Sequence, residues 1–461
     1  MRTLSRIFFY ICIPYLMNGQ DNSFYSQYDS SLKKKSFFKN DSIKYFNFYP
    51  SLYGVSVHNE AALSTSYLIG LASFSDLSNK ISVSGSFNYL GGNHNILLRK
   101  YKDSLDIYPG FGKSYNKFNY NIQYRINNFF TLDAGRGNHS IGFGYRSLFL
   151  SDEVSSYPYV LLTSSFWKIK YYNLYTAFVD IRESDLYRRK YSASHYLDFK
   201  PTDNISICLF ESVIWQAMDG VFNRGYDIEY INPVIFYRPV EFSKASPDNV
   251  LLGLSIQISL TRFRFYGQFL LDDLNISSGP NTSNGFFQNK FAYQLGFKFK
   301  SVKSETFLEY NQVQPYTYAH KTPLQNYTHY NQALAHPFGA NFKELVLINS
   351  YKKGKWKVNN KSAYVVYGAD NDTSHFGQNI FVSDYDAQRA GKEFSYGNFN
   401  GQGNKTTVFN SFTEVIYKQE RFDLFLGFAY RYKKSELFSE NLYMPFIGIR
   451  INTDYDFYKD Y

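Results

Sequence analysis

The densest group of polar aromatic side chains lies in one stretch, residues 311–341. It contains Tyr316, Tyr318, His320, Asn326, Tyr327, His329 and Tyr330. Aromatic faces pack on the apolar C–H faces of sugar rings, and amide and imidazole groups bond to the hydroxyl rims. The stretch therefore predicts a glycan-binding loop. The alternative is that these rings simply pack the loop as a lid on the structure that carries it.

Sequence signatures of catalysis and of metal binding are missing. There is no GxSxG, no HExxH and no phosphate-binding glycine loop, and the eight histidines are scattered. Beyond the first 20 residues Cys208 is the one cysteine, so no disulfide and no Cys/His metal spacing is possible. We expect no catalytic residue, no cofactor and no metal. A hydrolase whose Ser and His face each other from adjacent strands is the alternative.

The elements that carry such a loop are predicted by residues 250–273. Large apolar residues alternate with small or polar ones from Val250 to Leu260, and again from Phe263 to Asp273 after the short turn Thr261-Arg262. Period-two alternation is typical of a strand with different surroundings on its two faces. Two strands of about 9–11 residues joined by a tight turn predict a hairpin of a transmembrane β-barrel. A soluble β-sandwich, usually with shorter strands, is the alternative.

Composition and the N-terminus support the membrane interpretation. Phe, Trp and Tyr make up 20% of the chain, although the mean hydropathy is only −0.38. Membrane barrels need aromatic girdles but have polar lumens and loops. Arg2 and Arg6 precede the apolar residues 7–17, which are followed by Asn18-Gly19-Gln20. We expect residues 1–20 to be a cleaved secretory signal peptide and the protein to reach a bacterial outer membrane.

Connections of alternating length predict how the barrel is threaded. After residue 250, short connections near 261–262, 301–303, 351–354 and 419–420 alternate with long ones at 272–290, 311–341, 368–405 and 433–441. Outer-membrane barrels have short periplasmic turns and long extracellular loops. We expect a periplasmic lead-in at 21–47 and an all-β barrel over 48–461. The candidate strands number about 16–18, and we choose 18, because both termini in the periplasm require an even number.

Residues 215–249 stand apart in this scheme. If the turns at 201–204 and 261–262 face the periplasm, the whole of 215–249 lies on the outer side between two strands. We expect it to fold over or into the lumen and close it; one extra strand pair is the alternative. Asn232-Pro233 and Arg238-Pro239 disfavour the middle of a paired strand.

Charged residues among apolar ones in a barrel must face the lumen, where they are usually paired. Arg146, Arg238 and Glu241 are of this kind. We expect an Arg–Glu network that pins an inward-folded segment, in preference to ligand binding.

The net charge of +10 leaves two explanations open. One is an anionic partner, either acidic polysaccharide or the phosphates of lipopolysaccharide. The other is a solvated surplus on the loops with no specific partner. Nucleic acid does not suit an exported barrel.

Three long stretches carry a family resemblance. GFGYRSLFLSDEVSSYPYV (142–160) and GVFNRGYDIEYINPVIFYRPVEFSKASPDN (220–249) resemble the Wzi family of outer-membrane capsule-assembly proteins. YNQVQPYTYAHKTPLQNYTHYNQALAHPFGANFKE (310–344) is similar to the branch of that family in gliding bacteria, the gliding motility protein RemB. Capsule-type members carry a periplasmic helical segment, and residues 21–80 show no helical period.

The resemblance implies a barrel of about eighteen strands whose lumen is closed by loops. It also implies a non-enzymatic role in attaching or organising surface polysaccharide at the cell surface. For the gliding branch it implies support of adhesion and movement, with gliding or surface-adhesion proteins as partners. The alternatives are a porin-like diffusion channel, which needs an open lumen, and a scaffold for other surface proteins.

Overall fold

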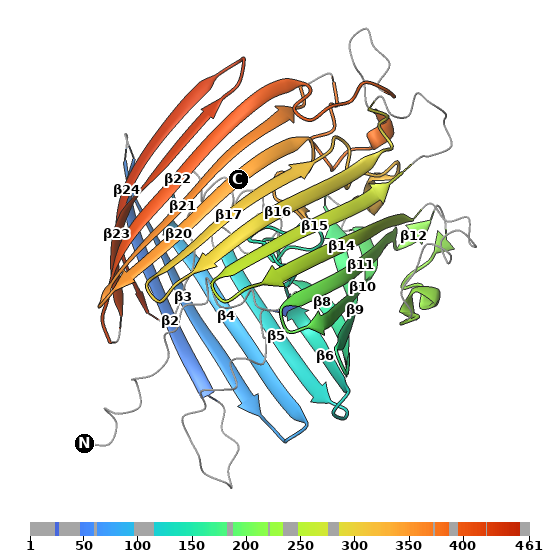
Figure 1. Ribbon diagram of the computed structural model, residues 1–461, viewed down its shortest axis with the longest axis horizontal. Helices are drawn as coiled ribbons and strands as arrows, with labels where there is room; N and C mark the ends of the chain where they lie inside the picture. The colour runs from blue at the N-terminus through green and yellow to red at the C-terminus, as the bar shows by residue number, and fades with distance from the viewer. Residues whose placement is uncertain are drawn as a thin grey trace.

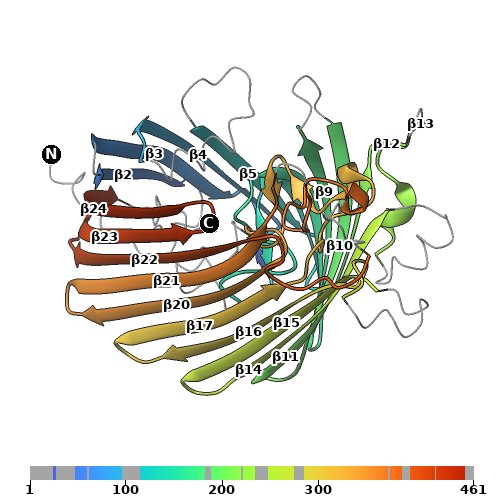
Figure 2. The same ribbon diagram turned by 90° about the horizontal axis from the view of Figure 1, so that it is seen from above.

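The strands form one closed barrel, seen from the side in Figure 1 and from above in Figure 2. The computed structural model describes residues 24–26, 47–59, 62–95, 115–181, 188–219, 222–233, 248–274, 285–371, 374–386, 395–420 and 422–451. The expected signal peptide and most of the expected lead-in lie outside these ranges. In the described part, no helix is long and apolar enough to cross a bilayer.

The barrel wall has 18 antiparallel strands, which confirms the expected fold class and strand number. They are β2 (Asn47–Asn59), β3 (Ala62–Asp76), β4 (Ile81–Asn93), β5 (Tyr115–Arg125), β6 (Phe130–Gly137), β8 (Tyr157–Phe166), β9 (Ile169–Asp180), β10 (Arg188–Thr202), β11 (Ile205–Gln216), β14 (Asn249–Ser259), β15 (Phe263–Asp273), β16 (Lys290–Lys300), β17 (Ser304–Val313), β20 (Phe342–Lys353), β21 (Trp356–Ala369), β22 (Asn404–Lys418), β23 (Asp423–Lys434) and β24 (Ser439–Ile451). Each pairs with the next, and β24 pairs with β2 to close the wall.

Short elements lie outside this wall order. They are β1 (Phe24–Ser26), β7 (His139–Ile141), β12 (Met218–Asp219), β13 (Phe222–Asn223), β18 (Thr328–His329), β19 (Gln332–Ala333) and the 3₁₀ turns η3 (Ile228–Ile231), η5 (Pro323–Gln325) and η6 (Asp384–Asp386). β1 pairs with β7, so a piece of the expected lead-in contacts the chain after β6.

The two faces of the wall have different surroundings, as the alternation predicted. On β14, Leu254, Ile256 and Ile258 are 40–43% exposed on the outward face. Ser255 and Gln257 between them are buried and face the lumen. Turns of a few residues join the strands at one end of the barrel, and most connections at the other end are long.

The sequence also predicts strands at 142–149 and 160–172, and both differ from the structure. Residues 142–149 form no strand; they belong to an inward connection between β7 and β8. The expected strand 160–172 is interrupted, because β8 ends at Phe166 and β9 begins at Ile169. Trp167, at the turn, has a φ of 50°. No glycine or proline marks this turn, so the sequence pattern predicts one continuous strand where the structure has two.

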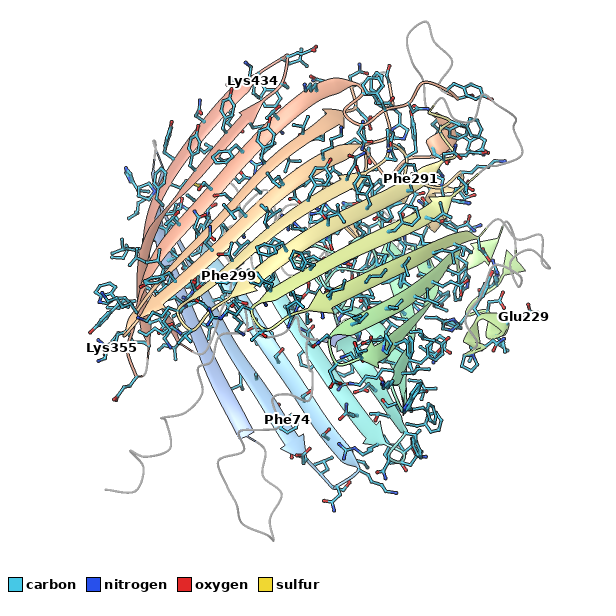
Figure 3. All side chains as sticks on the ribbon, viewed as in Figure 1. Phe74, Glu229, Phe291, Phe299, Lys355 and Lys434 are labelled. Carbon is cyan, nitrogen blue, oxygen red and sulfur yellow. The ribbon has the colours of Figure 1, made fainter. Side chains whose placement is uncertain are left out.

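The positive charge is concentrated at the end with the short turns. Among the described residues, ten exposed basic side chains lie there, against the exposed acidic side chains of Asp76, Asp203 and Glu420. They are Lys80, Arg125, Lys168, Lys170, Arg262, Lys300, Lys303, Lys352, Lys353 and Lys355. Figure 3 shows Lys355 at this end and Lys434 at the other. At the long-connection end the exposed charges nearly balance among the described residues.

Candidate functional site

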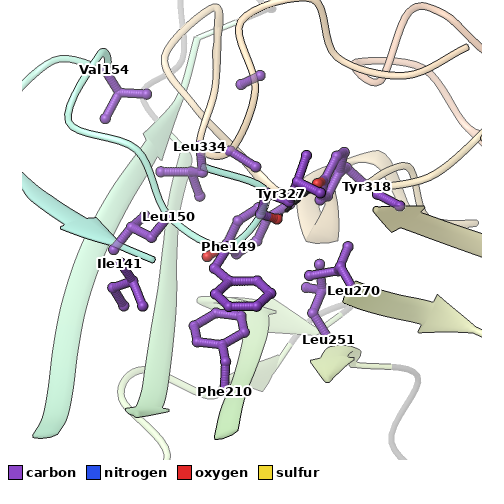
Figure 4. Close-up of a cluster of buried hydrophobic side chains, with 14 of the residues drawn as sticks. Ile141, Phe149, Leu150, Val154, Phe210, Leu251, Leu270, Tyr318, Tyr327 and Leu334 are labelled. Atoms are coloured by element: carbon purple, nitrogen blue, oxygen red, sulfur yellow. Dashed lines mark hydrogen bonds between the residues drawn. The ribbon is translucent and has the colours of Figure 1, made fainter. Parts of the chain in front are cut away.

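Three connections fold inward and fill the lumen. We call them the plug: residues 138–156, 314–341 and 374–386. Figure 4 shows Phe149, Tyr318 and Leu334 of the plug beside Phe210 and Leu251 of the wall. The Phe149 and Phe210 rings stack with their centroids 4.8 Å apart. Burial of these large apolar side chains is the main force that holds the plug in the barrel.

Hydrogen bonds between the plug segments join them into one body. The amide of Ser151 donates to the carbonyl of Leu334 at 2.7 Å. The Tyr318 hydroxyl donates to the carbonyl of Leu148 at 2.8 Å. Asn326 donates to the carbonyl of Ile380. The connections therefore form one body inside the barrel.

A charged network fixes the plug to the wall. Arg146 pairs with Glu344 of β20 at 3.3 Å, and the two side chains are 2% and 0% exposed. His336 contacts the same carboxylate at 2.7 Å. Glu309 of β17 accepts from the backbone amides of Tyr145 and Arg146 at 2.7 and 3.0 Å. An Arg–Glu network of the expected kind is present, but its acidic members come from β17 and β20.

Two plug histidines are held uncharged by their surroundings. Burial lowers the pKa of His139 to about 3. Burial, with the positive charges of Lys190 and Arg136, lowers the pKa of His329 to about 3. A neutral imidazole is easier to bury than a charged one. These groups therefore pack as part of the plug at neutral pH.

The predicted glycan-binding residues are together, but most are covered. Tyr316, Tyr318, Asn326, Tyr327, His329 and Tyr330 are at most 5% exposed, and His320 is partly buried. Tyr316, Tyr318 and Tyr330 have positive φ values of 66°, 72° and 51°, which is unusual for tyrosine. Their ring faces contact protein, as the lid alternative expected.

Residues 217–233, which we call the strap, do not fill the lumen. They lie against the outward face of the wall, as Figure 2 shows for β12 and β13. Tyr230 packs on Trp215 with ring centroids 4.9 Å apart. Trp215 lies on the outward face of β11, because Val213, two residues before it, pairs with Val250, which shares the face of the exposed Leu254. The described residues of 215–249 therefore do not take the expected lumen-closing role, and residues 234–247 lie outside the described residues. The inward segments are those of the plug, whose anchoring contacts are distant in sequence.

An ion pair fastens the strap at the end with the long connections. Arg224 makes two 2.7 Å bonds to the two carboxylate oxygens of Asp248, which also accepts from Tyr230 and from Gln325 of the plug. Asn232 is exposed. The other two residues singled out in this segment, Arg238 and Glu241, lie outside the described residues.

A partly exposed aromatic group at the mouth of the barrel was not predicted. We call it the mouth cluster: Phe286, Gln288, Lys321, Tyr385 and Tyr396. Phe286 and Tyr396 lie 5.2 Å apart, and the Lys321 ammonium lies 5.4 Å from the centre of the Tyr385 ring. Gln288 donates to the Tyr385 hydroxyl at 2.8 Å. Tyr385 is 45% exposed.

Buried residues support the mouth cluster from below. Phe287, beside Phe286, packs edge-on against Tyr316 and Tyr385, with ring centroids 6.3 and 5.4 Å away. Asp384 next to Tyr385 pairs with Lys290 of β16 at 2.6 Å. Tyr316, predicted as a sugar contact, is therefore a support. The cluster draws on three long connections, and no period in the sequence marks it.

Within the described residues, no group of three or more His, Cys, Asp or Glu side chains is placed to hold a metal ion.

No protein-family model matches the chain. No curated protein matches it either. Among solved structures, it resembles Wzi, described as a carbohydrate-binding β-barrel of the outer membrane involved in group 1 capsule assembly in Escherichia coli. The identity is 12%, over 88% of this chain and 85% of that chain, with a TM-score of 0.56. OccAB4 of Acinetobacter baumannii is 11% identical over 88% of this chain and 97% of its own, with a TM-score of 0.47. OprD of Pseudomonas aeruginosa is 9% identical over 88% of this chain and 95% of its own, also with a TM-score of 0.47. The likeness to Wzi shows the fold, that of an outer-membrane β-barrel.

Proposed function

We propose that this protein is a non-enzymatic outer-membrane barrel that attaches or organises surface polysaccharide. The mouth cluster carries the proposal. It offers aromatic faces, an amide and an ammonium group at the end where the connections are long. Aromatic rings with adjacent hydrogen-bonding groups suit sugar rings, which have apolar faces and hydroxyl edges.

The plug supports a binding role in preference to a channel. Binding surfaces gain from rigid support, because less conformational freedom is lost when the ligand binds. The mouth cluster rests on buried rings and on the Lys290–Asp384 ion pair. A liposome swelling assay that showed sugar-sized flux through the native protein would favour the porin-like alternative.

Charge has a small part in the proposed contact. The exposed basic surplus lies at the short-turn end, opposite the mouth cluster. Lipopolysaccharide phosphates and acidic polysaccharides therefore meet a nearly neutral described surface at the mouth. We expect glycan binding to depend weakly on salt, since screening acts mainly on exposed charges.

The decisive experiment measures retention of polysaccharide from the native cell surface by the purified barrel. Tyr385→Ala removes the exposed ring, and Leu437→Ala removes an exposed residue at the same end that lies outside the cluster. We expect Tyr385→Ala to weaken binding about five-fold, from the roughly 1 kcal/mol of one aromatic contact. Equal binding by both variants and the native protein would contradict the proposed site.

A link to gliding motility rests on the resemblance of 310–344 to RemB. We propose that polysaccharide held at the mouth supports adhesion during movement, together with surface-adhesion proteins. The test is spreading on agar by cells that carry Tyr385→Ala in place of the native chain. Normal spreading with reduced polysaccharide retention would separate the two roles.

A further inference from the structure

Six polar residues gather on the outward face of the wall. We call them the polar island: Thr306 of β17, Asn349 of β20, Asn360 and Ser362 of β21, and Ser411 and Thr413 of β22. Asn349 is paired with Thr306 on one side and Asn360 on the other, and Asn360 with Thr413. Paired residues share a face of the sheet. On β21 that face is outward, because Trp356 and Tyr364 are 53% and 48% exposed.

The neighbouring part of the wall shows what this face usually carries. Leu254, Ile256, Phe265, Phe269 and Leu295 on β14–β16 are exposed and apolar. The outward face of a membrane barrel is an apolar band about 25 Å tall. The polar island interrupts that band.

The island lies within the band and below its upper edge. Asn360 is four residues from Trp356 and four from Tyr364, both exposed aromatics on the same face of β21. At about 3.3 Å per residue and a tilt of about 45°, four residues rise roughly 9 Å. Asn360 is therefore surrounded by the hydrocarbon of the membrane.

Most of the island satisfies its own hydrogen bonds. Asn360 donates to Thr413 at 2.9 Å, and Ser362 donates to Asn360 at 3.2 Å. Ser362 and Ser411 lie 3.1 Å apart. The Asn349 amide makes no hydrogen bond to any residue that the structure describes. Lipid tails offer it no partner, so lipid alone leaves this amide unsatisfied.

We propose that the polar island is the contact surface between two copies of this chain in the membrane. An asparagine amide is both donor and acceptor, so identical islands can pair across a two-fold axis. Ser, Thr and Asn side chains are the ones that bond across protein contacts within membranes. A second copy supplies the partner that Asn349 lacks.

The test uses a cysteine at the island in the full-length protein, reconstituted in phospholipid vesicles. Asn349→Cys is treated with a short bismaleimide, and Ile256→Cys on the apolar wall is the matched control. Cys208 is fully buried and does not interfere. We expect at least ten-fold more cross-linked dimer from Asn349→Cys. In nanodiscs, we expect the native chain to contain two copies by mass and Asn349→Leu to contain one.

Two results would overturn the proposal. One is equal cross-linking of the two cysteine variants, together with a single native chain per nanodisc. The other is that Asn349→Cys, in native membranes, links to a different protein while no dimer forms. Asn349 faces away from the lumen. We therefore expect Asn349→Leu to leave polysaccharide binding unchanged, which keeps this test independent of the mouth cluster.

Discussion

Removing Arg146 tests whether the charged network holds the plug in the barrel. Its guanidinium is the cation of a pair with Glu344 in which both side chains are at least 98% buried. Arg146→Met keeps much of the apolar stem and leaves the Glu344 carboxylate without this cation. Breaking a buried ion pair by removing one partner costs about 3–5 kcal/mol.

The contacts that Glu344 keeps place the expected loss of stability at the lower end of this range of about 3–5 kcal/mol. Glu344 keeps the amide of Asn311 at 3.0 Å and His336 at 2.7 Å. We therefore expect Arg146→Met to lower the free energy of unfolding by about 3 kcal/mol. The measurement is the urea midpoint of the barrel in detergent micelles.

A double-mutant cycle separates the ion pair from general packing. Glu344→Gln leaves a buried guanidinium, and Arg146→Met with Glu344→Gln leaves neither charge. We expect the double variant to lose about 1–3 kcal/mol less than the sum of the single losses. Single-channel recordings then report whether the plug has moved, since a loosened plug admits ions. Additive losses with no change in conductance would refute the network as the anchor.

Three further expectations follow from buried contacts in and around the plug. Stability falls on acidification, because unfolded histidines take up protons near pH 6.5 while His139 and His329 have pKa values of about 3. At pH 5 each of these two histidines lowers the free energy of unfolding by about 2 kcal/mol, which urea titrations at pH 7 and pH 5 will measure. Gly253→Val displaces the plug, because a Cβ there lies 2.5 Å from the Phe149 ring. Its expected loss of about 1–3 kcal/mol is read from the same titration. Asp248→Asn releases the strap, and tryptophan fluorescence should shift to the red; an unchanged spectrum would contradict the anchoring role.

The strands of the wall could be predicted because each has two different surroundings. Lipid on one side and the lumen on the other impose the alternation seen from Leu252 to Ile258. Turn and loop lengths then order the strands, so the closed barrel follows from local patterns.

The plug could not be predicted in this way. Residues 146–150 are buried on every side, so their apolar spacing does not distinguish a strand from an inward connection. Their partners, Glu309 and Gln268, lie more than 100 residues away in sequence. Nothing near Arg146 indicates which carboxylates it will meet.

The tyrosine-rich stretch shows a second limit. Its polar aromatic composition predicts hydrogen-bonding partners but does not identify them. The Tyr318 hydroxyl bonds to the carbonyl of Leu148 and the Tyr316 hydroxyl to that of His375. A tyrosine hydroxyl can donate a hydrogen bond to a backbone carbonyl or to a sugar hydroxyl. The sequence alone therefore does not distinguish a lid from a binding site.

Closing the lumen and building the mouth cluster depend on the same residues. Lys321 and Tyr385 of the cluster belong to plug segments, and Tyr316 of the plug supports Phe287. A movement that opened the lumen to solutes would separate these segments and dismantle the cluster. A ligand that binds only the plugged state stabilises it, by about 2.7 kcal/mol at a hundred times its Kd. Under the proposed function, polysaccharide bound at the mouth would therefore hold the plug segments together.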